Sequence, residues 1–189
     1  MREQFIEELR NTGRKGIDNL ISAMDKGGFF TAPCSGSFHL AKEGGLLEHS
    51  LNVLKFSRQL NEAFGNPIAE DSITITALLH DLGKMGDHGK ANYTENYLKD
   101  GSRSKAKPYI TNPDLIYLPH EIRSVAIAER YIELTEDEET AIYFHNGLYS
   151  TFKYDIPGKE TQLYMILHTA DLWCSRFVEV EEKEEKKGD

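Results

Sequence analysis

The stretch Ala77-Leu78-Leu79-His80-Asp81-Leu82-Gly83-Lys84 places two ionisable side chains at the end of an apolar run. Ile73, Ala77 and His80 share one face of a helix that the periodicity predicts over about 71–84. Adjacent helical residues point about 100° apart, so His80 and Asp81 reach a common centre only if it lies between them. Burying both groups unpaired is costly. The stretch therefore predicts that further polar groups meet this pair inside the fold.

Three more polar residues fall on or beside apolar helical faces. His49 recurs with Val53 at helical spacing, His145 shares a face with Ile142, and Asp171 lies beside the apolar stripe of the last predicted helix. Taken singly, each is more often a hydrogen-bonded core residue than a ligand. Together with the His80-Asp81 pair they would need five separate partners, whereas one divalent cation could satisfy all of them.

Helical periodicity recurs along most of the chain and predicts an all-α fold class. The expected helices span 2–11, 16–27, 46–64, 71–84, 121–133, 136–146 and 160–180. Thr135-Glu136-Asp137-Glu138 forms a capping box at the start of the sixth. The length of 189 residues suits one domain, with N-terminal helices in 1–30 packing on a core domain over 40–178. The charge run 179–189 is expected to be a solvated, disordered tail.

Residues 85–119 show no sustained period, and this is long for a connection in a compact domain. Either short elements are present, such as a strand within 109–117, or the segment is a functional loop. Its most basic part is 99–107, which carries Lys99, Arg103, Lys105 and Lys107 against the single acid Asp100. A lid that closes over a ligand and a solvated loop are equally compatible with this pattern.

The charge balance limits the classes of partner. The formal net charge is −9, from 31 acidic and 22 basic residues, which argues against a broad nucleic-acid-binding face. A small phosphorylated substrate is not excluded, because a bound cation can dominate the local field. No apolar run approaches the roughly 20 residues of a membrane span. The N-terminal residues carry charges where a signal peptide needs an apolar segment, so the cytoplasm is the expected compartment.

The order of these residues resembles a known family. His49 after Gly44-Gly45, then His80-Asp81, then Asp171 in Ile166–Asp171 is similar to the HD superfamily of metal-dependent phosphohydrolases, over about residues 40–178. The nearest likenesses are stand-alone HD hydrolases and the HD portion of bacterial 3′→5′ exoribonucleases. The resemblance implies a helical bundle with a long loop insertion after the His-Asp helix. It also implies that His49, His80, Asp81 and Asp171 hold a metal ion.

The resemblance further implies one or two divalent transition-metal ions, with Fe, Mn, Zn, Ni and Co all left open. Many relatives add two histidines between the His-Asp pair and the last Asp, and His120 and His145 occupy those places. Asp81 would then bridge to a second ion held by His120 and His145. Some relatives have a His-His pair at the later position, where this chain has Asn146 as the second member. This departure leaves occupancy of the second site open.

The function that the resemblance implies is hydrolysis of a nucleotide or another small phosphate ester, as a phosphomonoesterase or phosphodiesterase. A bound metal lowers the pKa of its water to near neutrality and so provides a nucleophile. Asp81 and Lys84 are the candidate catalytic residues. Lys84, Arg103 and Arg123 are the candidates for contacting substrate phosphate.

Two other functions stay open at this point. A few HD proteins with six such ligands are mixed-valent di-iron oxygenases, and a catalytically silent nucleotide-binding module would keep the scaffold without turnover. Metal analysis combined with a search for an oxygen-dependent product separates the first from a hydrolase. The sequence does not fix the substrate, and it leaves formation of a homo-oligomer open.

Overall fold

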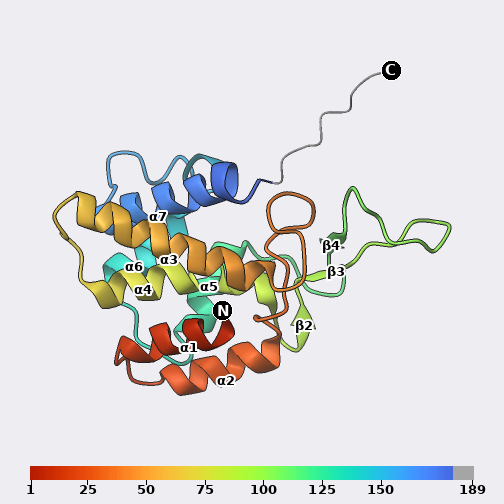
Figure 1. Ribbon diagram of the computed structural model, residues 1–189, viewed down its shortest axis with the longest axis horizontal. Coiled ribbons are helices and arrows are strands. Elements are labelled where there is room, and N and C mark those ends of the chain that lie inside the picture. Colours follow the sequence, from red (N-terminus) through yellow and green to blue (C-terminus); the bar gives the residue numbers. More distant parts are fainter. Residues whose placement is uncertain (181–189) are drawn as a thin grey trace.

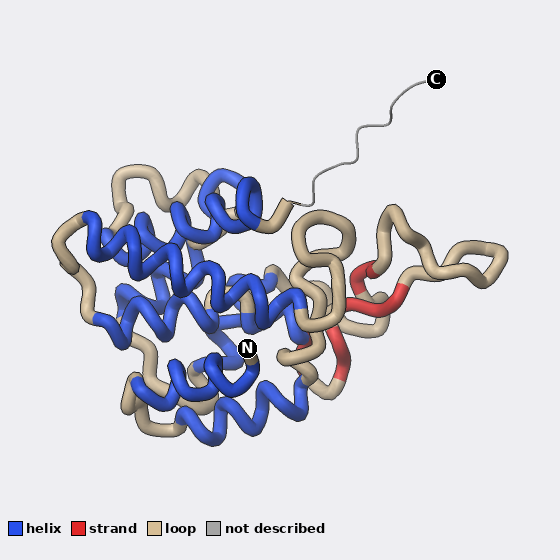
Figure 2. Tube along the Cα trace, in the orientation of Figure 1, coloured by secondary structure: helices blue, strands red, loops and turns tan. Residues whose placement is uncertain are grey.

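The computed structural model describes residues 1–180. Its helices gather into one bundle, while the short strands and the loops around them lie together at one end (Figures 1 and 2). The α-helices of the described residues are α1 (Arg2–Asn11), α2 (Ile17–Gly27), α3 (Gly45–Ala63), α4 (Glu70–Leu79), α5 (His120–Ala128), α6 (Glu136–Phe144) and α7 (Gln162–Trp173). The predicted all-α fold class is confirmed.

A single hydrophobic core runs through the bundle. In Figure 1, α3 and α4 cross its middle, α1 and α2 lie on one side of them and α7 on the other. Phe5 and Leu9 of α1 and Leu20 of α2 are fully buried, in the same cluster as Leu78 of α4 and Leu167 of α7. The apolar stripes that the periodicity identified therefore face one another across the bundle, and burying them is the main source of its stability.

Arg14, in the turn between α1 and α2, ties the N-terminal helices to the rest of the bundle. Its guanidinium forms ion pairs with Asp71 of α4 and with Glu138 of α6. The Glu138 side chain is fully buried, and it also completes the capping box with Thr135 that the sequence predicted. Because the charges are paired, burying this carboxylate is tolerated, and the pairing fixes α6 relative to α4.

The helix predicted to reach Lys84 ends at Leu79, and the chain continues as a short 3₁₀ helix, η1 (Leu82–Met85). The reason is close packing of η1 on α5. A Cβ added at Gly83 would lie 2.4 Å from the His120 carbonyl oxygen, and the Gly83 N–H donates to Ser124 Oγ at 2.8 Å. Only glycine permits this approach, which places η1 against the start of α5.

The segment 85–119 contains short strands between irregular stretches. Strand β1 (Gly86–Asp87) pairs with β2 (Lys90–Ala91), and β3 (Tyr93–Glu95) pairs with β4 (Tyr109–Thr111), both antiparallel. The strand predicted within 109–117 is thus present but covers only its first three residues. The chain between β3 and β4 projects away from the bundle (Figure 1), so the basic stretch 99–107 lies on an extended arm.

Other predicted helix ends shift as well. Helix α5 ends at Ala128 rather than 133, and α7 ends at Trp173 and passes into a π-helical turn, η3 (Cys174–Val178). A 3₁₀ turn, η2 (Gly147–Tyr149), follows α6. The prediction of a solvated tail from position 179 is wrong for Glu179, which is only 7% exposed. Positions 181–189 lie outside the described residues, so disorder there stays a prediction.

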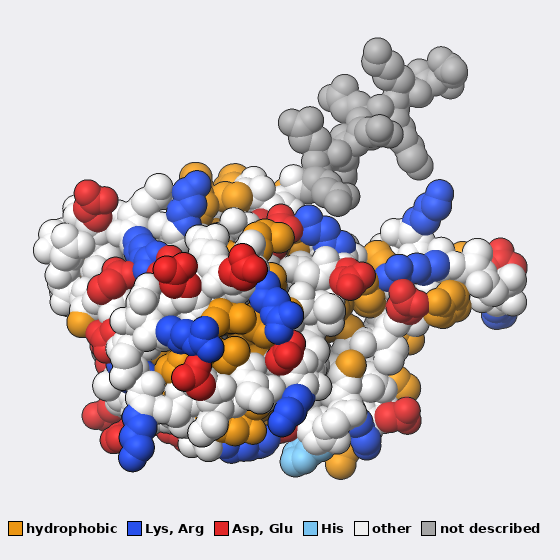
Figure 3. Space-filling view, turned by 60° about the horizontal axis from the view of Figure 1, so that its bottom comes forward, with side chains coloured by type: hydrophobic (Ala, Val, Ile, Leu, Met, Phe, Trp, Pro, Cys, Tyr) orange, Lys and Arg blue, Asp and Glu red, His pale blue; other side chains and the backbone are white. Residues whose placement is uncertain are grey.

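One face of the molecule carries no broad basic area. Acidic and basic side chains are interspersed on the face drawn in Figure 3, with no continuous basic area among the residues shown there. Within residues 1–180, no helix combines the length and apolar character needed to cross a bilayer.

Candidate metal centre

Five helices bring all six predicted metal ligands to one buried point. His49 comes from α3, His120 begins α5, and Asp171 lies near the end of α7. His80 and His145 directly follow α4 and α6, and Asp81 follows His80. His49, His80, Asp81 and His145 are each at most 1% exposed. The fold therefore collects polar side chains from positions far apart in sequence and removes them from water.

Asp81 separates the histidines into two pairs through its two carboxylate oxygens. Oδ2 lies 3.4 Å from Nε2 of His80 and 3.5 Å from Nε2 of His49. Oδ1 lies 3.2 Å from Nε2 of His120 and 3.5 Å from Nε2 of His145. Within the described part of the chain, Oδ1 is buried and has no hydrogen-bond partner. A carboxylate placed in this way can bridge two cations.

Asp171 completes the first of these two groups. Its Oδ1 lies 3.2 Å from Nε2 of His49, and this nitrogen lies 3.2 Å from Nε2 of His80. The ligand atoms of His49, His80 and Asp171 all lie within 4.8 Å of one another, and the same holds for His80, Asp81 and His145. Imidazole and carboxylate donors gathered this closely could hold a transition-metal ion.

His80 and His145 are oriented by the same kind of backbone hydrogen bond. Nδ1 of His80 donates to the carbonyl oxygen of Ala77 at 2.9 Å, and Nδ1 of His145 donates to that of Ile142 at 2.7 Å. Each bond runs to the carbonyl three residues earlier, at the end of a helix, and leaves Nε2 free to face the centre. Such a partner on the outer nitrogen is typical of metal-binding histidines. The C-terminal ends of two helices also favour a cation there.

Comparison with known proteins agrees with this geometry. The HD domain family model matches residues 46–172, which include the whole set from His49 to Asp171. The chain belongs to the HD-domain family. The resemblance predicted from the order of the histidines and aspartates is therefore confirmed.

One curated relative of this HD-domain protein is dihydroneopterin 2′,3′-cyclic phosphate phosphodiesterase of Methanocaldococcus jannaschii, which is 36% identical over 91 residues. The match covers 44% of this chain and 34% of the relative. The matched part of the chain thus spans about a third of the relative's length. No solved structure matches the chain.

The first histidine of the HD domain is held by a residue outside the matched segment. Glu179 Oε2 lies 2.9 Å from Nδ1 of His49 and 2.7 Å from Nδ1 of His39, while Oε1 accepts a hydrogen bond from Asn52 at 2.9 Å. Burial alone would raise the pKa of Glu179, but these histidines hold it well below its ordinary value. The carboxylate therefore stays charged beside His49.

Glu179 was missed in the sequence because it opens a run of charged residues. A signal was nevertheless present. Glu179 follows Asp171 by eight positions, and residues at i and i+8 share one face of a helix. The turn η3 keeps Asp171 and Glu179 on approximately the same face, so that the carboxylates of both residues reach His49.

The buried carboxylates and His80 favour the protonation states that bind metal. Burial would raise the pKa of Asp81, but Lys84 and His80 outweigh it and hold the pKa well below its usual value. The pKa of Asp171 is likewise held low by His49, against the effect of burial. Burial lowers the pKa of His80, which favours the neutral imidazole. Metal ligation needs these ionised carboxylates and a neutral ring.

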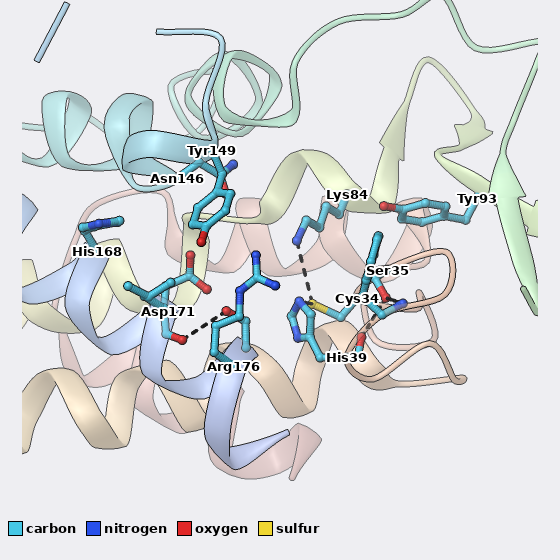
Figure 4. A pocket seen from close by; sticks show the side chains of 13 residues that line it. Cys34, Ser35, His39, Lys84, Tyr93, Asn146, Tyr149, His168, Asp171 and Arg176 are labelled. Carbon is cyan, nitrogen blue, oxygen red and sulfur yellow. Dashed lines mark hydrogen bonds between the residues drawn. The ribbon is translucent and has the colours of Figure 1, made fainter. Parts of the chain in front are cut away.

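A cavity of about 270 Å³ opens over the centre and is shown in Figure 4. Lys84 and Tyr93 enter it from one side, and Asp171 and Arg176 enter it from the other. Lys84 Nζ lies 2.6 Å from Oδ2 of Asp81 and 3.8 Å from Sγ of the buried Cys34. Lys84, a candidate for contacting substrate phosphate, thus lies in the wall of this cavity.

The structure does not bring Arg103 to this cavity. Arg103 lies on the projecting arm, where it pairs with Glu95 at 3.1 Å and covers the ring of Tyr109 at 4.8 Å. The arginine that lines this cavity is Arg176, where the sequence analysis had named Arg103 as the phosphate contact. It lies in the cavity wall, with its guanidinium 4.7 Å from the ring centre of Tyr149. No helical spacing singles out Arg176 in the sequence, because it belongs to the irregular turn η3.

Asn146, where some relatives have histidine, lies against His120. Its side-chain nitrogen is 3.0 Å from Nε2 of His120 and donates to Glu121 Oε1 at 2.8 Å. Glu121 in turn lies 3.3 Å from Nδ1 of His120. Asn146 thus orients His120, both directly and through Glu121.

Proposed function

We propose that this HD-domain protein is a metal-dependent phosphohydrolase whose substrate is a nucleotide or another small phosphate ester. The observation that carries the proposal is the position of Asp81 between two histidine pairs, one facing each carboxylate oxygen. A buried carboxylate oxygen without a partner is costly. A cation between Oδ1 and His120 with His145 would remove this cost, so the donor set fits a second ion as well as a first.

The first ion would be held by His49, His80, Asp81 and Asp171, and the second by Asp81, His120 and His145. Divalent cations at these positions would supply a water of lowered pKa as nucleophile and would stabilise charge on the phosphoryl group. The donors suit Fe, Mn, Zn, Ni and Co alike, and the identity of the bound metal does not change the roles of the protein's own residues.

Lys84 is proposed as the main protein contact to the phosphate. Burial would lower the pKa of Lys84, but Asp81 raises it well above the ordinary value, so the ammonium group keeps its charge. Arg176 on the opposite wall of the cavity can contact a second phosphate oxygen (Figure 4). Fixed positive charges on both sides would orient the ester and stabilise negative charge that develops during hydrolysis.

Two further observations support a small ester with a planar ring. Tyr93 and Tyr149 line the cavity over the centre, and aromatic side chains offer faces on which a base or pterin can stack. The curated relative is named as a phosphodiesterase of a neopterin cyclic phosphate, which combines such a ring with a phosphodiester. A nucleotide or a related cyclic phosphate is therefore the first substrate class to test.

The test is elemental analysis of the purified protein followed by assay of a panel of phosphomonoesters, linear phosphodiesters and cyclic phosphodiesters. We expect one or two transition-metal ions per chain and metal-dependent release of phosphate or ring opening for at least one class. Chelation should abolish turnover, and added metal should restore it.

Two results would contradict the proposal. Two iron ions with an oxygen-dependent product and no phosphate release would make the protein an oxygenase. A fully metal-loaded protein that binds nucleotides but hydrolyses no ester in the panel would be a binding module.

A further inference from the structure

Arg123 is a buried cation that forms no ion pair with any carboxylate of residues 1–180. The residue is 4% exposed and lies on α5, one turn after His120. Nη2 donates to the carbonyl oxygen of Ile116 at 2.9 Å, but Nε and Nη1 are buried and have no partner among the described residues. Each such donor normally finds an acceptor, and an unbalanced guanidinium is costlier than an unpaired neutral group.

Other arginines of the fold show how unusual this is. Arg14 pairs with Asp71 and Glu138, Arg58 with Glu8 and Glu70, and Arg130 with Asp87. All three side chains are more exposed than Arg123, yet each has at least one carboxylate. Arg123 is thus buried most deeply of the four and has only a backbone carbonyl as partner.

The surroundings of Arg123 form a cavity next to the metal centre. This second cavity has a volume of about 250 Å³ and is lined by Arg123, His120 and Glu121, among others. It shares Tyr93, Asn146 and Tyr149 with the cavity over Asp171 and Lys84. The two cavities therefore meet along these shared residues, and a single small molecule could occupy both.

We propose that Arg123 is the anion-binding residue of a second subsite beside the metal centre. The subsite would take a phosphate or carboxylate group and bind it to the free guanidinium nitrogens. This subsite, which rests on the proposed function, implies a substrate class. The substrates would be phosphate esters that carry a second anionic group besides the phosphoryl group that is hydrolysed. A guanidinium is suited to this role because it binds planar or tetrahedral oxyanions through two donors at once.

Access to the guanidinium is through the segment 113–119, which covers it. This segment contains no helix or strand, and the side chains of Ile116 and Tyr117 on it are 86% and 77% exposed. Leu115 anchors the segment by its buried side chain, but Ile116 and Tyr117 have few packing contacts to hold them in one place. A small shift of its backbone would open the subsite and release Nη2 from Ile116.

The first experiment measures anion binding without metal or turnover. Metal-free protein is titrated with inorganic phosphate at constant ionic strength, and thermal unfolding is followed for wild type, R123M, K84M and R130M. We expect phosphate to raise the melting temperature of wild type and R130M, and the apparent affinity to fall at least tenfold in R123M; K84M, which removes the proposed phosphate contact in the metal-side cavity, separates binding there from binding at Arg123. R130M is the matched control, because Arg130 follows α5 but pairs with Asp87.

The same experiment can overturn the proposal. An equal phosphate response in R123M and wild type would show that the guanidinium binds no anion, and loss of the response in K84M alone would place phosphate at the metal-side cavity. R123M should fold, since replacing an unbalanced buried charge by an apolar side chain is often neutral or stabilising. If it does not fold, R123K keeps the charge but loses the paired donors, and its phosphate affinity should still fall.

A second experiment uses the metal-loaded enzyme with matched esters that differ by one added group, either phosphate or carboxylate. Wild type should prefer one of the two-anion esters, and R123M should raise KM for that ester at least tenfold while leaving KM for the one-anion ester unchanged. The two-anion ester with the lower KM in wild type shows whether the second subsite binds a phosphate or a carboxylate group. Equal KM values for all esters in wild type would refute the substrate class. Phosphate binding that depends on Arg123 without any esterase activity would refute the proposed function and leave the subsite intact.

Discussion

The carboxylate of Glu179 lies 2.9 Å from Nδ1 of His49, so a residue beyond α7 orients the first histidine of the metal centre. The Glu179 side chain is 1% exposed, and it reaches His49 because η3 turns the chain back toward α3. A hydrogen-bonded carboxylate on the outer nitrogen fixes the ring and strengthens Nε2 as a donor. The C-terminal end of the described chain therefore contributes a residue to the candidate metal centre.

Replacing Glu179 with alanine should weaken metal binding without removing a ligand. Loss of such an outer partner typically costs about 10- to 100-fold in metal affinity. Competition with a chromophoric chelator would measure the affinity of E179A, with E160A as control, because Glu160 is exposed and lies before α7. An affinity for metal equal to that of wild type would show that His49 is held adequately without Glu179.

Replacing Asp81 with asparagine should remove metal and activity together. The amide keeps the shape of the side chain but loses the charge that both histidine pairs and Lys84 face. We expect loss of both ions and a fall in turnover of about 1,000-fold or more, since metal ions contribute several kcal/mol to transition-state stabilisation.

Elemental analysis and a rate assay on D81N would check this expectation. H88A is the control, because His88 is on the exposed turn after β1 with its side chain 78% exposed, and it should bind metal and turn over normally. Full metal content in D81N would mean that Asp81 bridges no ions.

Much of the centre was predictable from sequence because local periodicity decides which side chains face inward. His49 and His145 lie on apolar helical faces, and the cost of burying them pointed to a shared cation. The all-α fold follows from the same periodicity. These inferences need only the helical repeat, which can be read from each segment of sequence without knowing its contacts.

The rest depends on contacts between segments far apart in sequence. Glu179 was assigned to a solvated tail because it opens a run of charged residues, and its helical spacing from Asp171 does not by itself show that the chain returns to His49. Arg103 was a phosphate candidate by charge, yet the β3–β4 arm places it beside Glu95. The end of α4 was misplaced because the requirement at Gly83 comes from α5, some 40 positions later.

Replacing Gly83 with alanine should loosen the second half of the centre. The added Cβ would collide with the His120 carbonyl oxygen and with the Arg123 side chain, so η1 and α5 must move apart. Overpacking of this kind costs about 1–3 kcal/mol of stability. Because His120 begins α5, we also expect the variant to bind less than the wild-type amount of metal.

Chemical denaturation and elemental analysis of G83A would test both effects, with G13A as the matched control. Gly13 has a positive φ but open space around it, so G13A should lose about 1 kcal/mol through backbone strain and keep its full metal content. Metal content in G83A equal to that of G13A would show that close packing of η1 on α5 does not position His120.

The ion pair of Asp87 with Arg130 should make stability depend on acid pH in a defined window. Hydrogen bonds from Arg130 are the main cause that lowers the pKa of Asp87 from 3.8 to about 2. Because the folded pKa lies below the unfolded one, the stabilisation is fully present above about pH 4 and disappears as the pH falls through about 2. The pair is partly open to solvent, so its contribution is about 1 kcal/mol.

Unfolding free energies of wild type and D87N between pH 7 and pH 2 would measure this contribution by difference. Both proteins share every other titrating group, including the histidines of the metal centre, so those effects cancel in the comparison. The difference should be constant at neutral pH, shrink below about pH 4 and vanish near the folded pKa. A difference that stayed constant down to pH 2 would mean that the charge of Asp87 is not the source of the stabilisation.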